Sequence, residues 1–382
     1  MLTYSVKPRG GVVHALEVAE ALTRRGHDVE LVALAREGEE LFRPAAVPRR
    51  LVRHVPRDAP FDERIQDMLD AYADGLAPIL ADGGHDVVHA QDCLSANAAL
   101  TVRDDGVIDH VIRTVHHVDD FTSPSLIACQ DRSILEPDRV LCVSPPWIDR
   151  LAEDFGVRAE LVRNGVDAGR YRPAQGAAER AQARMEAGLG DRFAVMTVGG
   201  IEPRKGSLTL LDGFARLREL VPDRDPLLLI AGGMTLFDYR HERDRFAARA
   251  AALGIDAHVR VLGPLEPEAM ERLFRAADAF AFPSVKEGFG LAALEALAAE
   301  LPVVASDLDV FCGFLVPLES ALLVPPGDGA ALGRALARIA TDPGLAARLR
   351  AGGRRIVPAH TWDAAAAAHE RVYRAFLGAR VG

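Results

Sequence analysis

Two glutamates bracket a glycine-containing loop late in the chain. The segment Lys286-Glu287-Gly288-Phe289-Gly290 leads into an apolar stretch that holds Glu295. Backbone N–H groups of such a loop, and the positive end of a following helix, suit a phosphate. Carboxylates accept hydrogen bonds from neighbouring hydroxyl groups. If the segment is helical throughout, its eight residues span about 12 Å, so Glu287 and Glu295 are spaced to hold a sugar and a ribose on either side of a diphosphate.

A second loop carries paired cations. The run Val198-Gly199-Gly200-Ile201-Glu202-Pro203-Arg204-Lys205-Gly206 separates a predicted strand from a predicted helix. Arg204 and Lys205 together can neutralise the charge that develops on a departing diphosphate. Lysine is rare in this chain, and two of its three lysines, Lys205 and Lys286, lie beside these two loops.

The elements that position these loops alternate between short β-branched strands and amphipathic helices. Strands are predicted at residues 1–6, 29–34, 87–89, 111–115 and 140–143, and again at 193–198, 227–231, 259–262, 279–282 and 303–305. Helices are predicted at 12–25, 63–81, 208–221, 240–253, 267–277, 291–299 and 362–377, with Pro78 expected to kink or end the second of them.

This pattern predicts an α/β chain with two Rossmann-like domains that face each other across a cleft. Residues 1–168 form the first domain, residues 169–360 the second, and the helix in residues 361–382 crosses back to the first. Parallel sheets bind ligands at the carboxyl ends of their strands. The two loops above follow strands of the second domain, so we expect the ligand there.

Composition narrows the classes of function. The chain has 382 residues and a formal net charge of -10, which argues against a nucleic-acid partner. Residues 1–168 carry a net of -11 and the remainder +1, so the second domain is the better host for an anion. No apolar run approaches the roughly 18 residues of a membrane span, and the amino terminus lacks a secretory signal. We therefore expect a cytoplasmic protein.

The four cysteines, Cys93, Cys129, Cys142 and Cys312, lie far apart in the sequence. Their spacing indicates neither a zinc site nor a disulfide scaffold. We expect all four to be reduced and the protein to bind no metal.

Six motifs in order carry a family resemblance. They include the loop at 200–206, Glu287 to Glu295 (Glu-x7-Glu), Leu301-Pro302-Val303-Val304-Ala305, Gly10-Gly11, Thr114-Val115-His116 and Asn164-Gly165-Val166-Asp167. Together they resemble the family 4 glycosyltransferases, which are retaining enzymes of the GT-B fold. The resemblance covers nearly the whole chain.

The resemblance implies a hexosyl transfer from a nucleotide-diphosphate sugar, a UDP-, GDP- or ADP-hexose, with no other cofactor and no metal. Lys205 would meet the diphosphate and act with Glu287 and His116 as a catalytic residue. The donor-binding set it implies is Gly200, Arg204, Lys205, Glu287, Gly288, Phe289, Gly290 and Glu295. Gly200 stands where the family usually has an arginine, so either Arg204 takes over its role or the donor phosphate is held less tightly.

The acceptor side falls in the first domain. The resemblance implies that Gly10 and Gly11 let the backbone approach the reacting centre and that His116 touches the sugar or the acceptor. The sequence leaves open whether His116 or its neighbour His117 faces the cleft. The acceptor is a small molecule, a lipid-linked molecule or a glycan.

Two alternative functions remain open, and so does the role of one basic cluster. The pattern Gly288-x-Gly290-x-x-Ala293 also fits the fingerprint of an NAD-dependent oxidoreductase, and a non-catalytic sugar-nucleotide-binding protein would show the same loops. The basic cluster of Arg49, Arg50, Arg53, His54 and Arg57 is predicted as a loop after the second strand. It is either a solvated loop or a peripheral membrane contact.

Overall fold

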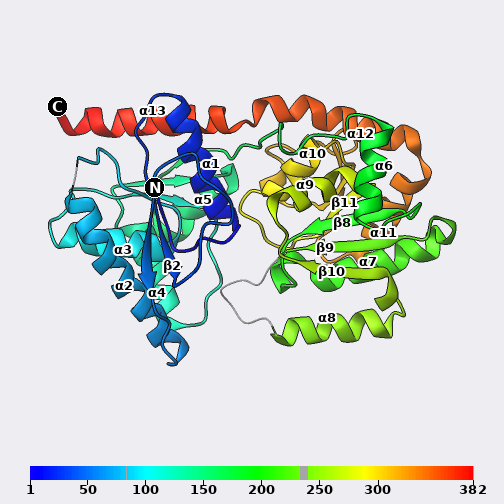
Figure 1. Cartoon of the computed structure of the whole chain (residues 1–382), viewed down its shortest axis with the longest axis horizontal. Coiled ribbons are helices and arrows are strands. Elements are labelled where there is room, and N and C mark those ends of the chain that lie inside the picture. Colours follow the sequence, from blue (N-terminus) through cyan, green and yellow to red (C-terminus); the bar gives the residue numbers. More distant parts are fainter. Residues whose placement is uncertain (83, 233–239, 382) are drawn as a thin grey trace. The chain divides into compact units, whose positions relative to one another are not determined.

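Short parallel strands form two separate sheets in this chain (Figure 1). The computed structural model describes residues 1–82, 84–232 and 240–381. The chain divides into two compact units: unit 1 is Met1–Gly165 with Trp362–Gly382, and unit 2 is Val166–Thr361. Each unit has the strand order and helical layers of a Rossmann-like fold. The predicted α/β class with two Rossmann-like halves is therefore confirmed.

The sheet of unit 1 has the order β3-β2-β1-β4-β5-β6-β7, and every pairing is parallel. Its strands are β1 (Leu2–Thr3), β2 (Leu31–Arg36), β3 (Arg49–His54), β4 (His89–Ala90), β5 (Ile112–Val115), β6 (Arg139–Cys142) and β7 (Ala159–Leu161). From β1 the strand order runs to one side through β2 and β3, and from β4 it runs to the other side through β5, β6 and β7. The switch point of the sheet therefore lies between β1 and β4. Open parallel sheets bind ligands at such a switch point, so the loops after these two strands are the ones to inspect.

Six helices belong to unit 1. They are α1 (Gly10–Arg24), α2 (Phe61–Ala81), α3 (Cys93–Asp104), α4 (Pro124–Leu135), α5 (Pro145–Phe155) and α13 (Trp362–Val381). Helix α2 runs through Pro78 to Ala81, so of the two outcomes expected at this proline, a kink or an end, the end does not occur there. Pro78 lies in the last turn, where one missing N–H removes little of the helix's hydrogen bonding.

The basic cluster was also assigned to the wrong type of element. Residues 49–54 form the edge strand β3, which pairs in register with β2. A loop was predicted because arginines dominate this stretch. Leu51 and Val52, which lie between the arginines, are the apolar positions of the strand. An edge strand with one solvated face tolerates such a pattern.

The sheet of unit 2 has the order β10-β9-β8-β11-β12-β13, again parallel throughout. Its strands are β8 (Ala194–Val198), β9 (Leu227–Ala231), β10 (Val259–Gly263), β11 (Ala279–Phe282), β12 (Val303–Ser306) and β13 (Ala321–Val324). The helices are α6 (Ala177–Glu186), α7 (Ser207–Leu220), α8 (Arg240–Ala252), α9 (Pro267–Ala276), α10 (Leu291–Ala298), α11 (Gly329–Thr341) and α12 (Pro343–Ile356). The switch point of this sheet lies between β8 and β11.

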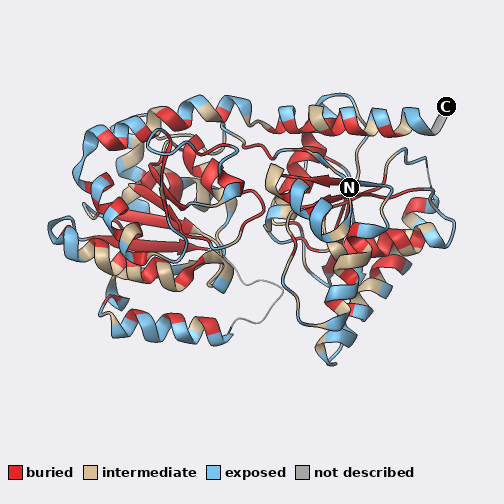
Figure 2. Ribbon diagram, turned by 180° about the vertical axis from the view of Figure 1, so that it is seen from behind, coloured by how far each residue is buried: buried red, intermediate tan, exposed pale blue. Residues whose placement is uncertain are grey.

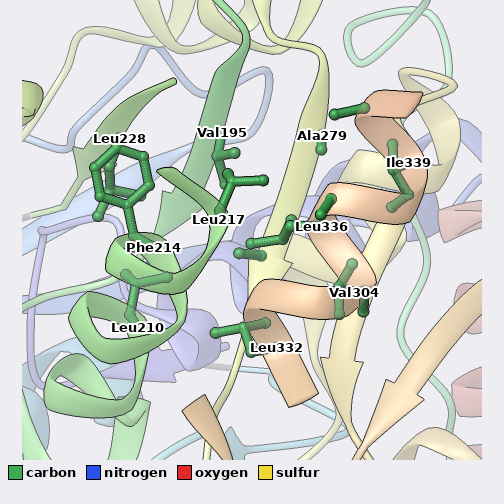
Figure 3. Close-up of a cluster of buried hydrophobic side chains, with 14 of the residues drawn as sticks. Val195, Leu210, Phe214, Leu217, Leu228, Ala279, Val304, Leu332, Leu336 and Ile339 are labelled. Atoms are coloured by element: carbon green, nitrogen blue, oxygen red, sulfur yellow. The ribbon is translucent and has the colours of Figure 1, made fainter. Parts of the chain in front are cut away.

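Unit 2 has a continuous apolar core between its sheet and two helices (Figure 3). Val195, Leu228, Ala279 and Val304 project from four neighbouring strands. They pack against Phe214 of α7 and against Leu332, Leu336 and Ile339 of α11. Strands covered on both faces read as unbroken apolar runs, which is why this half of the chain was the easier to predict. The rigid sheet fixes where the loops after β8 and β11 begin.

The last helix belongs to unit 1 although it follows unit 2 in the chain. Helix α13 packs against α1 (Figure 1), and its Val372 and Phe376 join Ile112, Leu141 and Val162 in one buried cluster. The inward face of α13 is buried and its outward face exposed (Figure 2). The border between the units lies at Gly165, three residues before the expected one.

Candidate functional site

In unit 2 the loops after β8 and β11 touch each other. Residues 203–205 form a single 3₁₀ turn, and Gly206 follows with a positive φ of 65°. A Cβ atom on Gly206 would stand 2.0 Å from the carbonyl oxygen of Pro283. The backbone N–H of Val285 donates to the carbonyl of Arg204 at 2.9 Å. This contact brings the cations of one loop onto the carboxylate of the other.

Lys205 and Glu287 form the centre of this arrangement. Nζ of Lys205 lies 2.6 Å from Oε1 of Glu287, and Nη1 of Arg204 lies 3.4 Å from Oε2. The hydroxyl of Ser284 donates to Glu287 Oε1 at 2.9 Å. Nζ of Lys205 also lies 5.0 Å from the centre of the Phe282 ring. The structure thus brings together Arg204, Lys205 and Glu287, which the sequence had placed on two separate loops.

The Glu287 carboxylate is buried, with 8% of its side chain exposed. Burial alone raises the pKa of a carboxyl group, but Lys205, Arg204 and the Ser284 hydroxyl outweigh it and lower the pKa of Glu287 to about 2. The group is therefore a charged hydrogen-bond acceptor at neutral pH and a weak base. Its oxygens are suited to receive hydroxyl or ammonium donors.

The second glutamate lies further along the same segment. Helix α10 begins at Leu291, as predicted, so the segment from Glu287 to Glu295 is not helical throughout and the 12 Å spacing that assumed this is wrong. Gly290 has a φ of 101°. A Cβ atom on Gly290 would lie 2.5 Å from Cε1 of Phe311, so there is no room for a side chain. The chain must turn here before it becomes helical, and Glu295 stands one turn into α10, half-buried.

Two other predicted donor residues frame this loop. Phe289 is buried and stacks on Phe314 with ring centres 5.0 Å apart. Its side chain therefore belongs to the core, which leaves its backbone as the part that can serve a ligand. Gly288 is also buried. Gly200 is half-buried in the loop after β8. Arg204, the candidate substitute for the arginine missing at Gly200, lies on Glu287 and also donates to the Lys286 carbonyl at 3.2 Å.

In unit 1 the predicted residues cluster at the carboxyl ends of β1, β4 and β5. Helix α1 begins at Gly10, and a Cβ on Gly11 would lie 3.3 Å from Cδ2 of His116. His116 is half-buried and its Nε2 lies 3.1 Å from Oε1 of Gln91. Gly11 and His116 are therefore neighbours, as the proposed approach to a reacting centre requires.

The neighbouring histidine lies elsewhere. Nε2 of His117 lies 3.2 Å from Oδ2 of Asp119, within its own loop, so the structure groups His116 and not His117 with Gly11. Burial, with His14 nearby, lowers the pKa of His116 well below its usual range. The ring is neutral at physiological pH, with one nitrogen a donor and the other an acceptor.

Sequence reasoning missed the residues that hold His116 in place. His14 of α1 meets the His116 ring edge-on at 4.9 Å, and His14 Nδ1 lies 2.6 Å from Oδ1 of Asn164. Gln91 follows directly after β4. Its position at the end of a central strand was the available signal, because ligand-facing side chains gather there.

Two aspartates, Asp307 and Asp309, follow strand β12 and are exposed. Within residues 1–82, 84–232 and 240–381 no three metal-ligating side chains gather. The arginines of the basic cluster are paired with acidic side chains: Arg50 with Glu30 at 2.7 Å and Arg53 with Glu40 at 2.9 Å. In the described part of the chain, no helix is long and apolar enough to cross a membrane.

Two family models match consecutive parts of the chain. Residues 8–170 match the family model "Glycosyltransferase Family 4", and residues 180–356 match "Glycosyl transferases group 1". The D-inositol 3-phosphate glycosyltransferase of Saccharomonospora viridis is 30% identical over 98% of this chain and 91% of the relative. That of Nocardia farcinica is also 30% identical, over 98% and 87%.

The chain belongs to glycosyltransferase family 4. Solved structures agree in fold: the sucrose-phosphate synthase of Thermosynechococcus elongatus superposes with a TM-score of 0.82 at 23% identity, covering 99% of this chain and 98% of the other. The Anabaena HepE protein, in complex with UDP and glucose, gives 0.74 at 17% identity with 98% of both chains covered. This family 4 chain has the GT-B architecture and is a glycosyltransferase.

Membership of family 4 disfavours the oxidoreductase interpretation. The glycine pattern that suggested it follows β11, the fourth strand of unit 2, whereas a dinucleotide fingerprint follows the first strand of its sheet.

Proposed function

We propose that this family 4 enzyme moves a hexosyl group from a nucleotide-diphosphate sugar to an acceptor hydroxyl with retention of configuration at the anomeric carbon. The observation that carries the proposal is the buried ion pair between Lys205 and Glu287 at the switch point of the unit 2 sheet. It offers a cation to the diphosphate and a carboxylate to the sugar within one contact.

Donor binding exchanges the partners of this ion pair. The diphosphate oxygens replace Glu287 as partners of Lys205 and Arg204, and the released carboxylate accepts hydrogen bonds from sugar hydroxyls. Both charges stay compensated, which matters because an unpaired buried charge is costly. The backbone N–H groups at 288–290 and the start of α10 face the donor, and Glu295 binds the ribose. UDP-glucose is the first donor to test, since the HepE structure contains UDP and glucose.

The reaction needs no protein nucleophile. The leaving diphosphate departs as an oxocarbenium-like centre forms, and its own oxygen takes the proton from the acceptor hydroxyl that attacks the same face. Glu287 serves to hold the sugar, because its carboxylate oxygens accept hydrogen bonds from sugar hydroxyls. Lys205 and Arg204 stabilise the departing charge, and no metal is required.

The acceptor binds unit 1, beside His116 and Gly11. The relatives at 30% identity are named for D-inositol 3-phosphate, so a phosphorylated polyol is the first acceptor class to test. His116 is neutral, because burial and His14 lower its pKa, and it contacts the transferred sugar or the acceptor hydroxyl as a hydrogen-bonding group. We propose a cytoplasmic site of action, where nucleotide sugars are available.

The test begins with thermal stability in the presence of UDP, GDP, ADP, their glucose conjugates and NADH. A ligand that binds only the folded state raises the melting temperature. We expect one nucleoside diphosphate to do so, and Lys205→Met to lose the effect while Lys7→Met keeps it.

Transfer from the matching sugar conjugate to inositol 3-phosphate should then give a product whose anomeric configuration, read by NMR, equals that of the donor. An inverted product, or stabilisation by NADH alone, contradicts the proposal. Tight donor binding without transfer to any acceptor or to water would favour a non-catalytic binding protein.

A further inference from the structure

Two cysteines from different helices meet in unit 1. Cys93 is the first residue of α3, and Cys129 lies on α4. Both are free thiols, and the Cys93 side chain is the largest influence on the pKa of the Cys129 thiol, which it raises. They are far apart along the chain, but the helices that carry them, α3 and α4, pack against each other.

A buried amide holds the two cysteines in this position. Nδ2 of Asn97 donates to the carbonyl of Cys93 at 2.8 Å and to that of Cys129 at 2.7 Å. The same nitrogen lies 3.4 Å from Sγ of Cys129. One side chain thus ties both cysteine backbones together, so the thiols remain neighbours. A disulfide bond joins two sulfur atoms at roughly 2.05 Å, and cysteines held by one shared side chain are placed to form it.

The two thiols differ in access. Cys93 is half-buried, whereas Cys129 is 4% exposed. The guanidinium of Arg113 interacts electrostatically with both cysteines. The Cys93 side chain, together with burial, raises the pKa of the Cys129 thiol. Cys93 is therefore the thiol that meets an oxidant first, and Cys129 is placed to react with it afterwards.

We propose that Cys93 and Cys129 form a reversible disulfide, which makes this pair an oxidation site of the protein. Cys93 attacks one sulfur of a low-molecular-weight disulfide, and one thiol leaves. Cys129 then loses its proton and attacks Sγ of Cys93, and the second thiol leaves. Two protein thiols are oxidised while one external disulfide is reduced to two thiols.

The cross-link would join two elements that adjoin His116. Cys93 follows Gln91 by two residues, and Gln91 contacts His116. On α4, Gln130 follows Cys129 and exchanges hydrogen bonds of 2.8 Å and 3.1 Å with the backbone of Asp119, in the loop that carries His116. Oxidation therefore restrains the acceptor side of the site. This consequence rests on the function proposed above, whereas the disulfide itself does not.

The experiment uses the full chain with Cys312→Ser, because exposed Cys312 would otherwise form disulfides between molecules. The folded protein is incubated with glutathione disulfide, alkylated, digested and analysed by mass spectrometry. We expect an intact mass about 2 Da below that of the reduced protein and a linked peptide pair containing Cys93 and Cys129. Reduction with dithiothreitol should reverse both changes.

Matched variants separate the two steps. Adding Cys129→Ser should stop the reaction at a glutathione adduct on Cys93, adding Cys93→Ser should prevent it, and adding Cys142→Ser should leave the disulfide unaffected. A Cys312→Ser protein that keeps both thiols, or that stops at the glutathione adduct, overturns the proposal without need of any further variant. Transfer rates of the oxidised and reduced forms test the effect on function separately, so an unchanged rate counts only against that consequence.

Discussion

Gly206 and Pro283 approach so closely that a Cβ atom on Gly206 would stand 2.0 Å from the Pro283 carbonyl oxygen. This bare backbone contact seats the loop after β8 on the loop after β11. It is the reason that Lys205 reaches Glu287, since the lysine directly precedes the glycine. The ion pair of the candidate donor site therefore depends on a residue that has no side chain.

Gly206→Ala should destabilise unit 2 strongly. The alanine would adopt a positive φ, which costs about 1–2 kcal/mol, and would collide with backbone that has no room to move. We expect a total loss of at least about 3 kcal/mol in urea unfolding. Gly190→Ala is the matched control, because Gly190 has a φ of 56° and nothing within 4 Å of the added carbon. Equal losses in the two variants would show that the contact with Pro283 does not matter.

Lys205→Met should lower stability as well as activity. It leaves the buried Glu287 charge with fewer donors, and breaking a buried pair from one side costs about 3 kcal/mol or more. Lys7→Met removes the exposed Lys7–Glu39 pair at 3.4 Å and should cost less than about 1 kcal/mol. Chemical denaturation of the two variants side by side makes the comparison. A Lys205 variant as stable as wild type would mean that Glu287 finds other compensation.

Glu287→Gln tests the carboxylate without changing its shape. The amide is a weaker acceptor for sugar hydroxyls and leaves Lys205 and Arg204 facing each other, so we expect transfer to fall by about 100-fold or more. Glu319→Gln, on an exposed side chain, should transfer at the wild-type rate. The measurement is the initial rate at saturating donor. Full activity in Glu287→Gln would remove this residue from the site.

His116→Ala should lower kcat/KM for transfer by about 100-fold, because the ring lies beside Gly11 where the acceptor is expected. His117→Ala should change it less than about tenfold, since His117 pairs with Asp119 instead. Gly11→Ala should also slow transfer by pressing on the His116 ring. Equal effects of the two histidine variants would contradict the assignment of His116.

Unit 1 should lose stability as the pH falls below about 6.5. Burial lowers the pKa of His14 to about 3 and that of His369 to about 4, and burial also lowers the pKa of neighbouring His89 and His116. Between the ordinary pKa and these lowered values the unfolded chain binds protons that the folded chain excludes, so acid favours unfolding. Each histidine contributes up to about 1.4 kcal/mol per pH unit.

A single variant tests this acid sensitivity. His369→Leu should reduce the slope of unfolding free energy against pH between about pH 4 and 6.5 by up to one histidine's share. His85→Leu, on an exposed side chain, should leave the slope unchanged. Denaturant unfolding followed at several pH values measures both. If His369→Leu shows the wild-type slope, the buried ring is not the group that titrates.

The sequence was a good guide wherever a strand is apolar on both faces. The ranges Leu227–Ala231 and Ala279–Phe282 were predicted to the residue, because buried parallel strands leave no ambiguous polar positions. The edge strand β3 was missed because its exposed face carries arginines. The start of α10 at Leu291 was also predicted to the residue, whereas the packing of the preceding Gly290 against Phe311 is not revealed by any local pattern.

The charged residues of the candidate site were predictable from the sequence, but the contacts between them were not. Charge and loop position marked Arg204, Lys205 and Glu287 from the sequence alone. Their mutual contact depends on Gly206 approaching Pro283 across two strands, which the sequence does not encode locally. The surroundings of His116 were hidden for the same reason, since Gln91, His14 and Asn164 come from distant segments.

The order of synthesis has a consequence for how this protein matures. The apolar cluster of Ile112, Leu141 and Val162 is closed by Val372 and Phe376, which are synthesised after these three residues. All of Val166–Thr361 is made earlier. During translation the second unit can complete its core first, while the first unit waits for its final helix with an uncovered apolar surface. Loss of the carboxyl-terminal helix should therefore harm the half of the protein that is synthesised first.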